Sequence, residues 1–213
     1  MKLTQRIHPQ RLTYRILLGL TIISPLLIAP AAFAHHPFGG STPNTFITGF
    51  LSGLGHPVVG LDHLTFVIGS GLVAIGLQWG LIVPIAFLAT ALLGTSFHLM
   101  GFDMPLLEAA IASSVVLWGL VLVRKEAFQN TAILAALGAI AGIFHGYAYG
   151  EAIIGAEMSP MIAYLSGFTL IQGGIAFAAY GIGKNLFQSL PSLVPYFGLT
   201  ICAIGVVFFS QAI

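Results

Sequence analysis

The sequence contains very little charge: Asp, Glu, Lys and Arg make up only 6% of its 213 residues. A soluble domain carries roughly 25% charged residues, whereas this chain is 57% hydrophobic. It has no long polar run from which a soluble domain could be built, and its net charge of +1 gives no footprint of nucleic-acid binding. These absences exclude both of those classes and predict an integral membrane protein.

Cysteine is also nearly absent, because Cys202 is the only one in the chain. A single cysteine excludes an intrachain disulfide and a cluster of thiolate metal ligands. The sequence contains no nucleotide-binding motif either. If the protein moves a solute, we therefore expect transport to be channel-like, coupled to another ion, or dependent on a partner.

The N-terminal 34 residues have the pattern of a cleavable signal peptide. An apolar stretch covers residues 16–29, and the small-x-small sequence that precedes a cleavage site ends at Ala34. The alternative is an uncleaved extra span. The basic region before the apolar stretch consists of Lys2, Arg6, Arg11 and Arg15.

The rest of the chain predicts an all-α, polytopic membrane protein. Because a hydrocarbon core about 30 Å thick needs about 20 apolar residues per helix, six spans are expected after the signal, in a domain over residues 46–213. A short outer segment, residues 35–45, precedes them. The first span is expected to be interrupted near Pro57, where glycines precede the proline. The expected spans are residues 46–77, 80–97, 106–123, 131–150, 161–182 and 192–213.

Basic residues in the loops predict the orientation of these spans. Lys and Arg collect in cytoplasmic loops, so Arg124, Lys125 and Lys184 are expected inside. With six spans, the mature N-terminus then lies outside the cytoplasmic (inner) membrane, in agreement with the signal peptide. All histidines of the mature chain fall in the outer half or on the outer surface, namely His35, His36, His56, His63, His98 and His145.

The first candidate site is the octapeptide at residues 56–63, which carries His56, Asp62 and His63. Ionisable groups inside a membrane span are functional candidates, and imidazole with carboxylate suits divalent transition metals. Two helical turns separate the histidines by about 10.5 Å, so only a broken helix lets His56 approach the other two. Asp62 either ligates directly or orients His63. The alternative is a hydrogen-bonded cluster that only fixes helix packing.

A second candidate group lies at residues 144–151. His145 and Tyr149 are four residues apart and share a helix face. Glu151 stands near the outer boundary, where it is either a further ligand or an exposed loop carboxylate. The alternative for His145 is a core histidine hydrogen-bonded to a carbonyl.

Three further histidines are candidate capture points on the outer side. After cleavage, the free amine and imidazole of His35, with His36 beside it, form a chelating pair; the alternative is an ordinary terminal segment. His98 ends the second expected span and is a candidate relay.

Glycines recur every four residues in the fourth expected span, at Gly138, Gly142, Gly146 and Gly150. This spacing puts them on one helix face, where the missing side chains let another helix approach closely. We expect them to serve helix packing and so to bring His145 near another helix.

The paired motifs resemble the HupE/UreJ family. The likeness rests on His-Pro-x-x-Gly-x-Asp-His at residues 56–63 and Phe-His-Gly-x-Ala at residues 144–148. It implies a small membrane protein with a signal peptide and about six spans that takes up nickel, or cobalt in some members, for hydrogenase or urease maturation. The chain departs from the family pattern at Tyr149, where a histidine is expected, and at Ala152, where the glutamate is expected.

The favoured function is therefore a permease for Ni²⁺ or Co²⁺, serving metalloenzyme or cobalamin maturation, with no permanent cofactor and no enzymatic activity. Few and exchangeable ligands suit conduction. The alternatives are an intramembrane metalloenzyme resembling a zinc hydrolase and a metal-binding accessory protein without transport. Besides the metal ion and the lipid bilayer, the candidate partners are a second copy of the chain and a metallochaperone.

Overall fold

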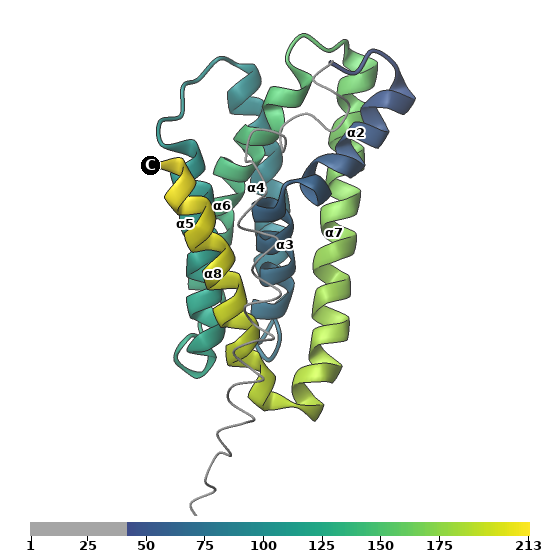
Figure 1. The fold of residues 1–213 in the computed structure, drawn as a ribbon. Coiled ribbons are helices and arrows are strands. Elements are labelled where there is room, and N and C mark those ends of the chain that lie inside the picture. The colour runs from purple at the N-terminus through teal and green to yellow at the C-terminus, as the bar shows by residue number, and fades with distance from the viewer. Residues whose placement is uncertain (1–41) are drawn as a thin grey trace, which may run out of the picture. The chain divides into compact units, whose positions relative to one another are not determined.

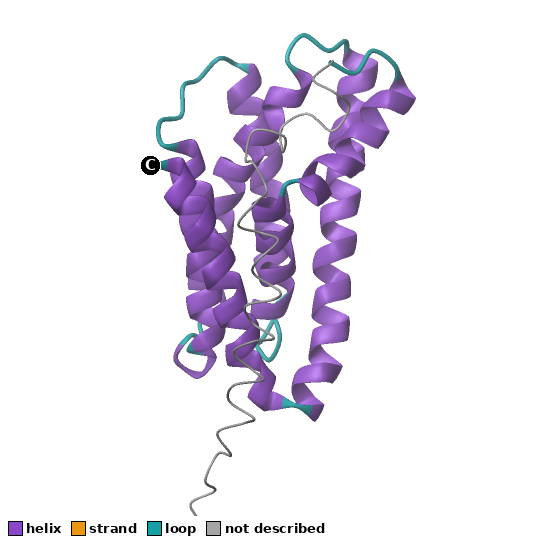
Figure 2. Cartoon of the chain, viewed as in Figure 1, coloured by secondary structure: helices purple, strands orange, loops and turns teal. Residues whose placement is uncertain are grey.

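The computed structural model describes residues 42–213, all within the unit Ala31–Ile213. Among these residues the secondary structure is entirely helical (Figure 2). The predicted signal peptide and its cleavage site lie outside the described residues. The helices are α2 (Phe46–Val59), α3 (Leu61–Val73), α4 (Ile82–Leu99), α5 (Leu107–Val123), α6 (Thr131–Gly150), α7 (Met158–Ser189) and α8 (Val194–Ala212), with short 3₁₀ turns η3 (Lys125–Ala127), η4 (Glu151–Ile153) and η5 (Pro191–Leu193).

The polarity of the bundle is reversed relative to that of a soluble protein. Large apolar side chains cover its outside, as at Leu170, which is 64% exposed, while histidine, aspartate and glutamine are buried inside. Within residues 42–213, four helical stretches are able to cross a membrane by length and composition: Ile82–Leu99, Thr131–Ile153, Met158–Ser189 and Pro191–Ala212. The protein is an integral membrane protein.

The remaining helices are apolar but shorter. Helix α5 follows the third expected span closely, whereas α2 and α3, with 14 and 13 residues, divide the first one. At 1.5 Å per residue each of these two is about 20 Å long, and neither alone spans a core of about 30 Å. The count of six complete spans therefore stays a prediction.

Helix α3 occupies the centre of the bundle (Figure 1). Three pairs of helices pack along their lengths: α4 against α6, α5 against α8, and α2 against α7. Helix α3 contacts members of all three pairs, and ten of its 13 residues are buried. A side chain on α3 can therefore meet groups from most of the other helices.

The first expected span is interrupted near Pro57, as the sequence predicted, but the break lies three residues after the proline, at Gly60 between α2 and α3. Helix α2 continues past the proline, because the Gly60 amide still donates to the His56 carbonyl at 3.1 Å. Gly60 then turns extended, with φ −73° and ψ 99°, and its own carbonyl accepts from Leu64 at 2.8 Å. Pro57 lacks a backbone N–H and so removes only one hydrogen bond from α2. Gly60 is the single residue that separates the two helices.

Glycines make the close contacts in two of the helix pairs. A Cβ atom added at Gly146 would overlap the Ala91 carbonyl oxygen of α4, and one added at Gly53 would overlap the Tyr164 carbonyl of α7. The Thr95 hydroxyl of α4 donates to the Gly146 carbonyl at 2.7 Å. The four-residue glycine repeat of α6 faces α4, and Gly53 is a contact point between α2 and α7.

Lys125 closes the end of α3 that lies opposite Gly60. Its Nζ donates to the Val73 carbonyl at 2.8 Å, where an unpaired carbonyl and the negative end of the helix dipole favour a cation. Burial lowers the pKa of this amine to about 8. The loop after α5 is thereby attached to the central helix.

Candidate functional site

Three buried histidines from three helices meet near the break between α2 and α3. His56 comes from the last turn of α2, His63 from the first turn of α3 and His145 from the second half of α6, and each is at most 1% exposed. The rings of His56 and His63 are 6.0 Å apart, and those of His63 and His145 are 4.9 Å apart. An unbroken helix would separate His56 from His63 by about 10.5 Å along its axis, so the break brings them together.

Hydrogen bonds connect His63 and His145 to α5. The two Nδ1 atoms are 2.8 Å apart, so one nitrogen donates and the other accepts. The other nitrogen of His145, Nε2, lies 3.0 Å from Oγ of Ser114. The Ser114 hydroxyl also donates to the Ile111 carbonyl at 2.6 Å. This chain of bonds holds one edge of the cluster against α5.

A second chain of hydrogen bonds connects His56 to α6 and α7. His56 Nδ1 lies 2.9 Å from the Tyr164 hydroxyl, which donates to the Tyr149 carbonyl at 3.0 Å. The Tyr149 hydroxyl in turn donates to Oε1 of Gln172 at 3.0 Å. Nε2 of Gln172 is buried with no hydrogen-bond partner among the described residues, which is costly for an amide donor. Tyr149 also places its ring 5.0 Å from His56 and 4.7 Å from His63.

Asp62 precedes His63 at the start of α3 and is only 6% exposed. Its Oδ1 accepts from the backbone amide of His63 at 2.8 Å, which satisfies one of the open amides in the first turn of α3. A carboxylate at this position is also favoured by the positive end of the helix dipole. Asp62 thus fixes the turn that carries His63.

Aromatic side chains close the cluster on the side of the apolar core. Phe66 packs 4.5 Å from His145 and stacks on Trp118 at 5.3 Å, and Phe87 lies 5.5 Å from His145. These three aromatic side chains are at most 1% exposed. The histidines therefore lie at a boundary between a polar cluster and a densely packed apolar core.

The donor atoms are suited to a divalent transition metal, although the described residues include no group of three or more His, Cys, Asp or Glu arranged to hold one. Two imidazole nitrogens, each about 2.1 Å from one ion, lie about 3.0 Å apart when the ligands are at right angles. The His63–His145 nitrogen distance of 2.8 Å is close to that value. The spacing suits neighbouring ligands, but as it stands the contact is a hydrogen bond with the proton on one ring, so only one of the two nitrogens offers a lone pair.

Of the other predicted ligands, the structure describes His98 and Glu151. The His98 ring packs 4.3 Å from Tyr147, and its Nδ1 is buried without a hydrogen-bond partner in the described part of the chain. Glu151 begins η4 and is half-buried. His35 and His36 lie outside the described residues. Their metal-binding roles stay predictions.

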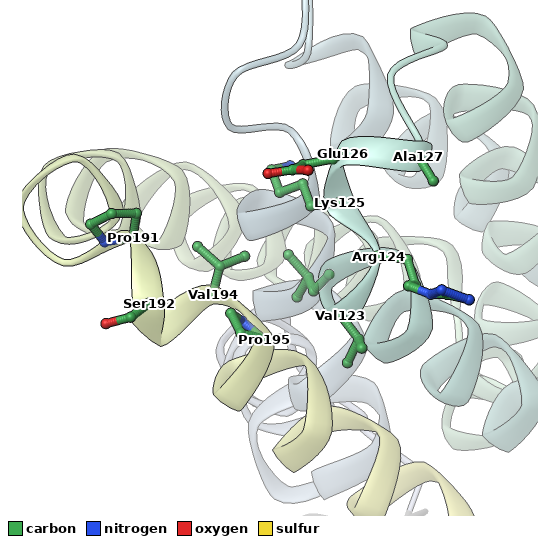
Figure 3. Close-up of a pocket in the computed structure, with 10 residues that line it drawn as sticks. Val123, Arg124, Lys125, Glu126, Ala127, Pro191, Ser192, Val194 and Pro195 are labelled. Carbon is green, nitrogen blue, oxygen red and sulfur yellow. The ribbon is translucent and has the colours of Figure 1, made fainter. Parts of the chain in front are cut away.

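A pocket of about 600 Å³ lies at the other end of the bundle, between the loop after α5 and the start of α8 (Figure 3). Arg124, Lys125 and Glu126 line it together with Ser192 and apolar side chains. Its lysine caps α3, and α3 separates it from His63. The pocket offers one carboxylate and no imidazole, so it has a poor ligand set for a transition metal.

Ser114 and Tyr164 contact the histidines directly but were not predicted from the sequence. Ser114 follows Ser113 on α5, and only the fold shows that Ser113 is exposed while Ser114 turns inward. Tyr164 resembles any aromatic residue of an apolar helix. No local pattern distinguishes either residue, because both act on side chains distant in the sequence.

Comparisons with known proteins give one consistent result. The family model described as HupE / UreJ protein matches residues 23–208, most of the chain. The curated protein named Protein HupE, from Rhizobium leguminosarum bv. viciae, is 35% identical over 143 residues, which cover 64% of this chain and 73% of that protein. No solved structure matches the chain.

Proposed function

The chain belongs to the HupE/UreJ family, and from this premise we propose that it is a permease that takes up Ni²⁺ or Co²⁺ for metalloenzyme or cobalamin maturation. The ion is its transported substrate. We place the protein in the cytoplasmic (inner) membrane, with its mature N-terminus and the histidine cluster toward the outside. His56, Asp62, His63 and His145 are the proposed ligands on its path.

One observation supports this proposal above all: three imidazoles from three helices converge, fully buried, in an apolar membrane bundle. Burying polar groups costs free energy unless they are hydrogen-bonded, and apolar side chains would pack the same space without that cost. The cluster also lies where the path-lining helix is broken, at Gly60. Interrupted helices at the middle of a membrane are typical of substrate sites in transporters.

The chemistry of the cluster suits an ion that must bind and leave again. Neutral imidazole and carboxylate accept Ni²⁺ and Co²⁺, and conduction requires sites that release the ion. The ion would break the hydrogen bond between His63 and His145 and take over the lone pair that accepts it. Asp62, buried beside His63, would offset part of the ion's charge in an environment of low dielectric constant.

The proposal is tested by reconstituting the protein in liposomes and following the entry of radioactive nickel and cobalt. We expect entry above that of empty liposomes, and loss of most of it in His63→Ala and in His145→Ala. Ser113→Ala, on the exposed face of α5, is the control and should transport like the wild type.

The same experiment separates the two alternative functions. Tight metal binding in fixed stoichiometry without entry would support an accessory protein. Zinc-dependent hydrolysis that is lost in the same two variants would support a metalloenzyme. Entry that is unchanged in both histidine variants would refute the proposed path.

A further inference from the structure

We infer that Ser114 and Tyr164 are positioning residues that set which nitrogen of each buried histidine carries the proton. Neither residue belongs to the two sequence motifs, and both touch imidazole nitrogens directly. The protonation pattern follows from hydrogen bonding alone. Its consequence for metal binding rests on the proposed function.

Tyr164 decides the pattern at His56. Its hydroxyl has a single proton and two neighbours, the Tyr149 carbonyl at 3.0 Å and His56 Nδ1 at 2.9 Å. A carbonyl oxygen only accepts, so the phenol proton must go to Tyr149 if that contact is a hydrogen bond. The contact with His56 is then a hydrogen bond only if Nδ1–H donates to the phenol oxygen. In the neutral ring the lone pair therefore belongs to Nε2.

Ser114 decides the pattern at His145 by the same reasoning. Its hydroxyl proton goes to the Ile111 carbonyl at 2.6 Å, which leaves the Ser114 oxygen as the acceptor for His145 Nε2–H at 3.0 Å. The lone pair of neutral His145 is then on Nδ1. That atom lies 2.8 Å from His63 Nδ1, which must be the donor, so the lone pair of His63 is on Nε2.

The consequence is a defined set of metal-binding atoms. Lone pairs are present at Nε2 of His56, at Nε2 of His63 and at Nδ1 of His145, and the third of these accepts a hydrogen bond from His63. An arriving ion that uses His145 must displace only that bond. Partners that hold the second nitrogen of a ligating histidine fix its orientation, and their loss typically weakens metal binding about 10- to 100-fold.

The protonation pattern is measured directly by ¹⁵N NMR of the full-length protein, labelled at histidine and kept free of metal in detergent micelles. We expect protonated Nδ1 at His56 and His63 and protonated Nε2 at His145, with each signal assigned by single His→Gln variants. The opposite tautomer at His56 or His145 would overturn the inference, whatever the protein transports.

The role in binding is measured by titrating the purified protein with Ni²⁺ alone. Tyr164→Phe and Ser114→Ala should each weaken binding about 10- to 100-fold and mix the tautomers of the ring they touch. Ser114→Thr, which keeps the hydroxyl, should restore both properties. Tyr180→Phe on α7 and Ser113→Ala on α5 are matched controls and should change neither.

Failure of this inference is distinguishable from failure of the proposed function. If the NMR pattern is as expected but the wild type neither binds nor admits Ni²⁺, the metal function is wrong and the structural assignment stands. If the wild type admits Ni²⁺ and both positioning variants bind it as tightly as the controls with unmixed tautomers, the positioning role is refuted.

Discussion

At the scale of residues, a few buried side chains form the hydrogen bonds that hold the histidine rings. The hydroxyls of Tyr164 and Ser114 form hydrogen bonds with His56 and His145. A neutral imidazole can make these bonds, so neither ring has to carry a charge in the apolar interior. Asp62 holds the turn that carries His63, because its buried carboxylate accepts from the backbone amide of His63. Position within the fold therefore distinguishes Ser114, which contacts His145, from Ser113, which is exposed.

Lys125 gives a prediction at the same scale. Its pKa is lowered from 10.5 to about 8 by burial, so between those values the unfolded chain binds more protons than the native one. Stability should therefore rise with pH from about 8 to 10.5, and below 8 the full cost of burying the charge is present. Water reaches part of the amine, so we expect an effect on the order of 1 kcal/mol, or about 2–4 °C in Tm.

The measurement is thermal unfolding in detergent at several pH values, for the wild type and for Lys125→Met. The difference in Tm between the two should change across this window, because the variant lacks the titrating amine. Every other ionisable side chain is present in both proteins, so its contribution cancels in the comparison. Parallel Tm curves would show that Lys125 is not the group responsible.

At the scale of elements, two features arrange the site: the break at Gly60 and the glycine face of α6. Gly60 has an ordinary negative φ, so its lack of a side chain matters for space rather than for backbone freedom. A Cβ atom there would lie 2.8 Å from Cδ2 of His63. The glycines of α6 let α4 approach closely and so set the position of the helix that carries His145.

Gly146→Ala tests the close approach of α4 and α6. The new methyl group would overlap the Ala91 carbonyl oxygen, so the helices must separate. Overpacking of this kind typically costs about 1–3 kcal/mol. Gly174→Ala on α7 is the control, because nothing lies within 4 Å of its added Cβ.

Thermal unfolding in detergent measures both glycine variants. The control should be neutral or slightly more stable than the wild type, since alanine is the better helix former. Equal stability of Gly146→Ala and Gly174→Ala would contradict the close packing of α4 on α6.

For the whole molecule, the reversed polarity explains why a small bundle can hold imidazoles and a carboxylate at its centre. Lipid-facing apolar side chains make the outside compatible with a bilayer, while polar groups find partners only by facing inward. The loop after α5 and the break at Gly60 lie at opposite ends of α3. Under the proposed function, the orientation of the bundle decides which side of the membrane supplies the ion.

Orientation is tested with single-cysteine variants in a Cys202→Ser background. Glu157→Cys, before α7, should react with a membrane-impermeant thiol reagent on intact cells. Glu126→Cys, in η3, should react only after the membrane is opened, because basic loops stay in the cytoplasm. The reverse pattern would turn the histidine cluster toward the cytoplasm and imply an exporter.

Much of this protein follows from its sequence alone, because long apolar stretches in a chain with 6% charged residues have few alternatives to membrane helices. The helices α4, α5, α6 and α8 lie within a few residues of the expected spans, and the break in the first span was expected near Pro57, three residues before its position at Gly60. Hydrogen bonding within a helix is local, so composition and spacing are enough to predict it.

The contacts between helices were decided only by the tertiary structure. The approach of His63 Nδ1 to His145 Nδ1, across 82 positions of sequence, depends on glycine packing and on the single residue at which α2 ends. Ser114 and Tyr164 became partners of the histidines in the same way. The sequence shows which polar groups lie in apolar helices. Which of them become hydrogen-bond partners depends on helix packing, because the same packing excludes water from all of these groups.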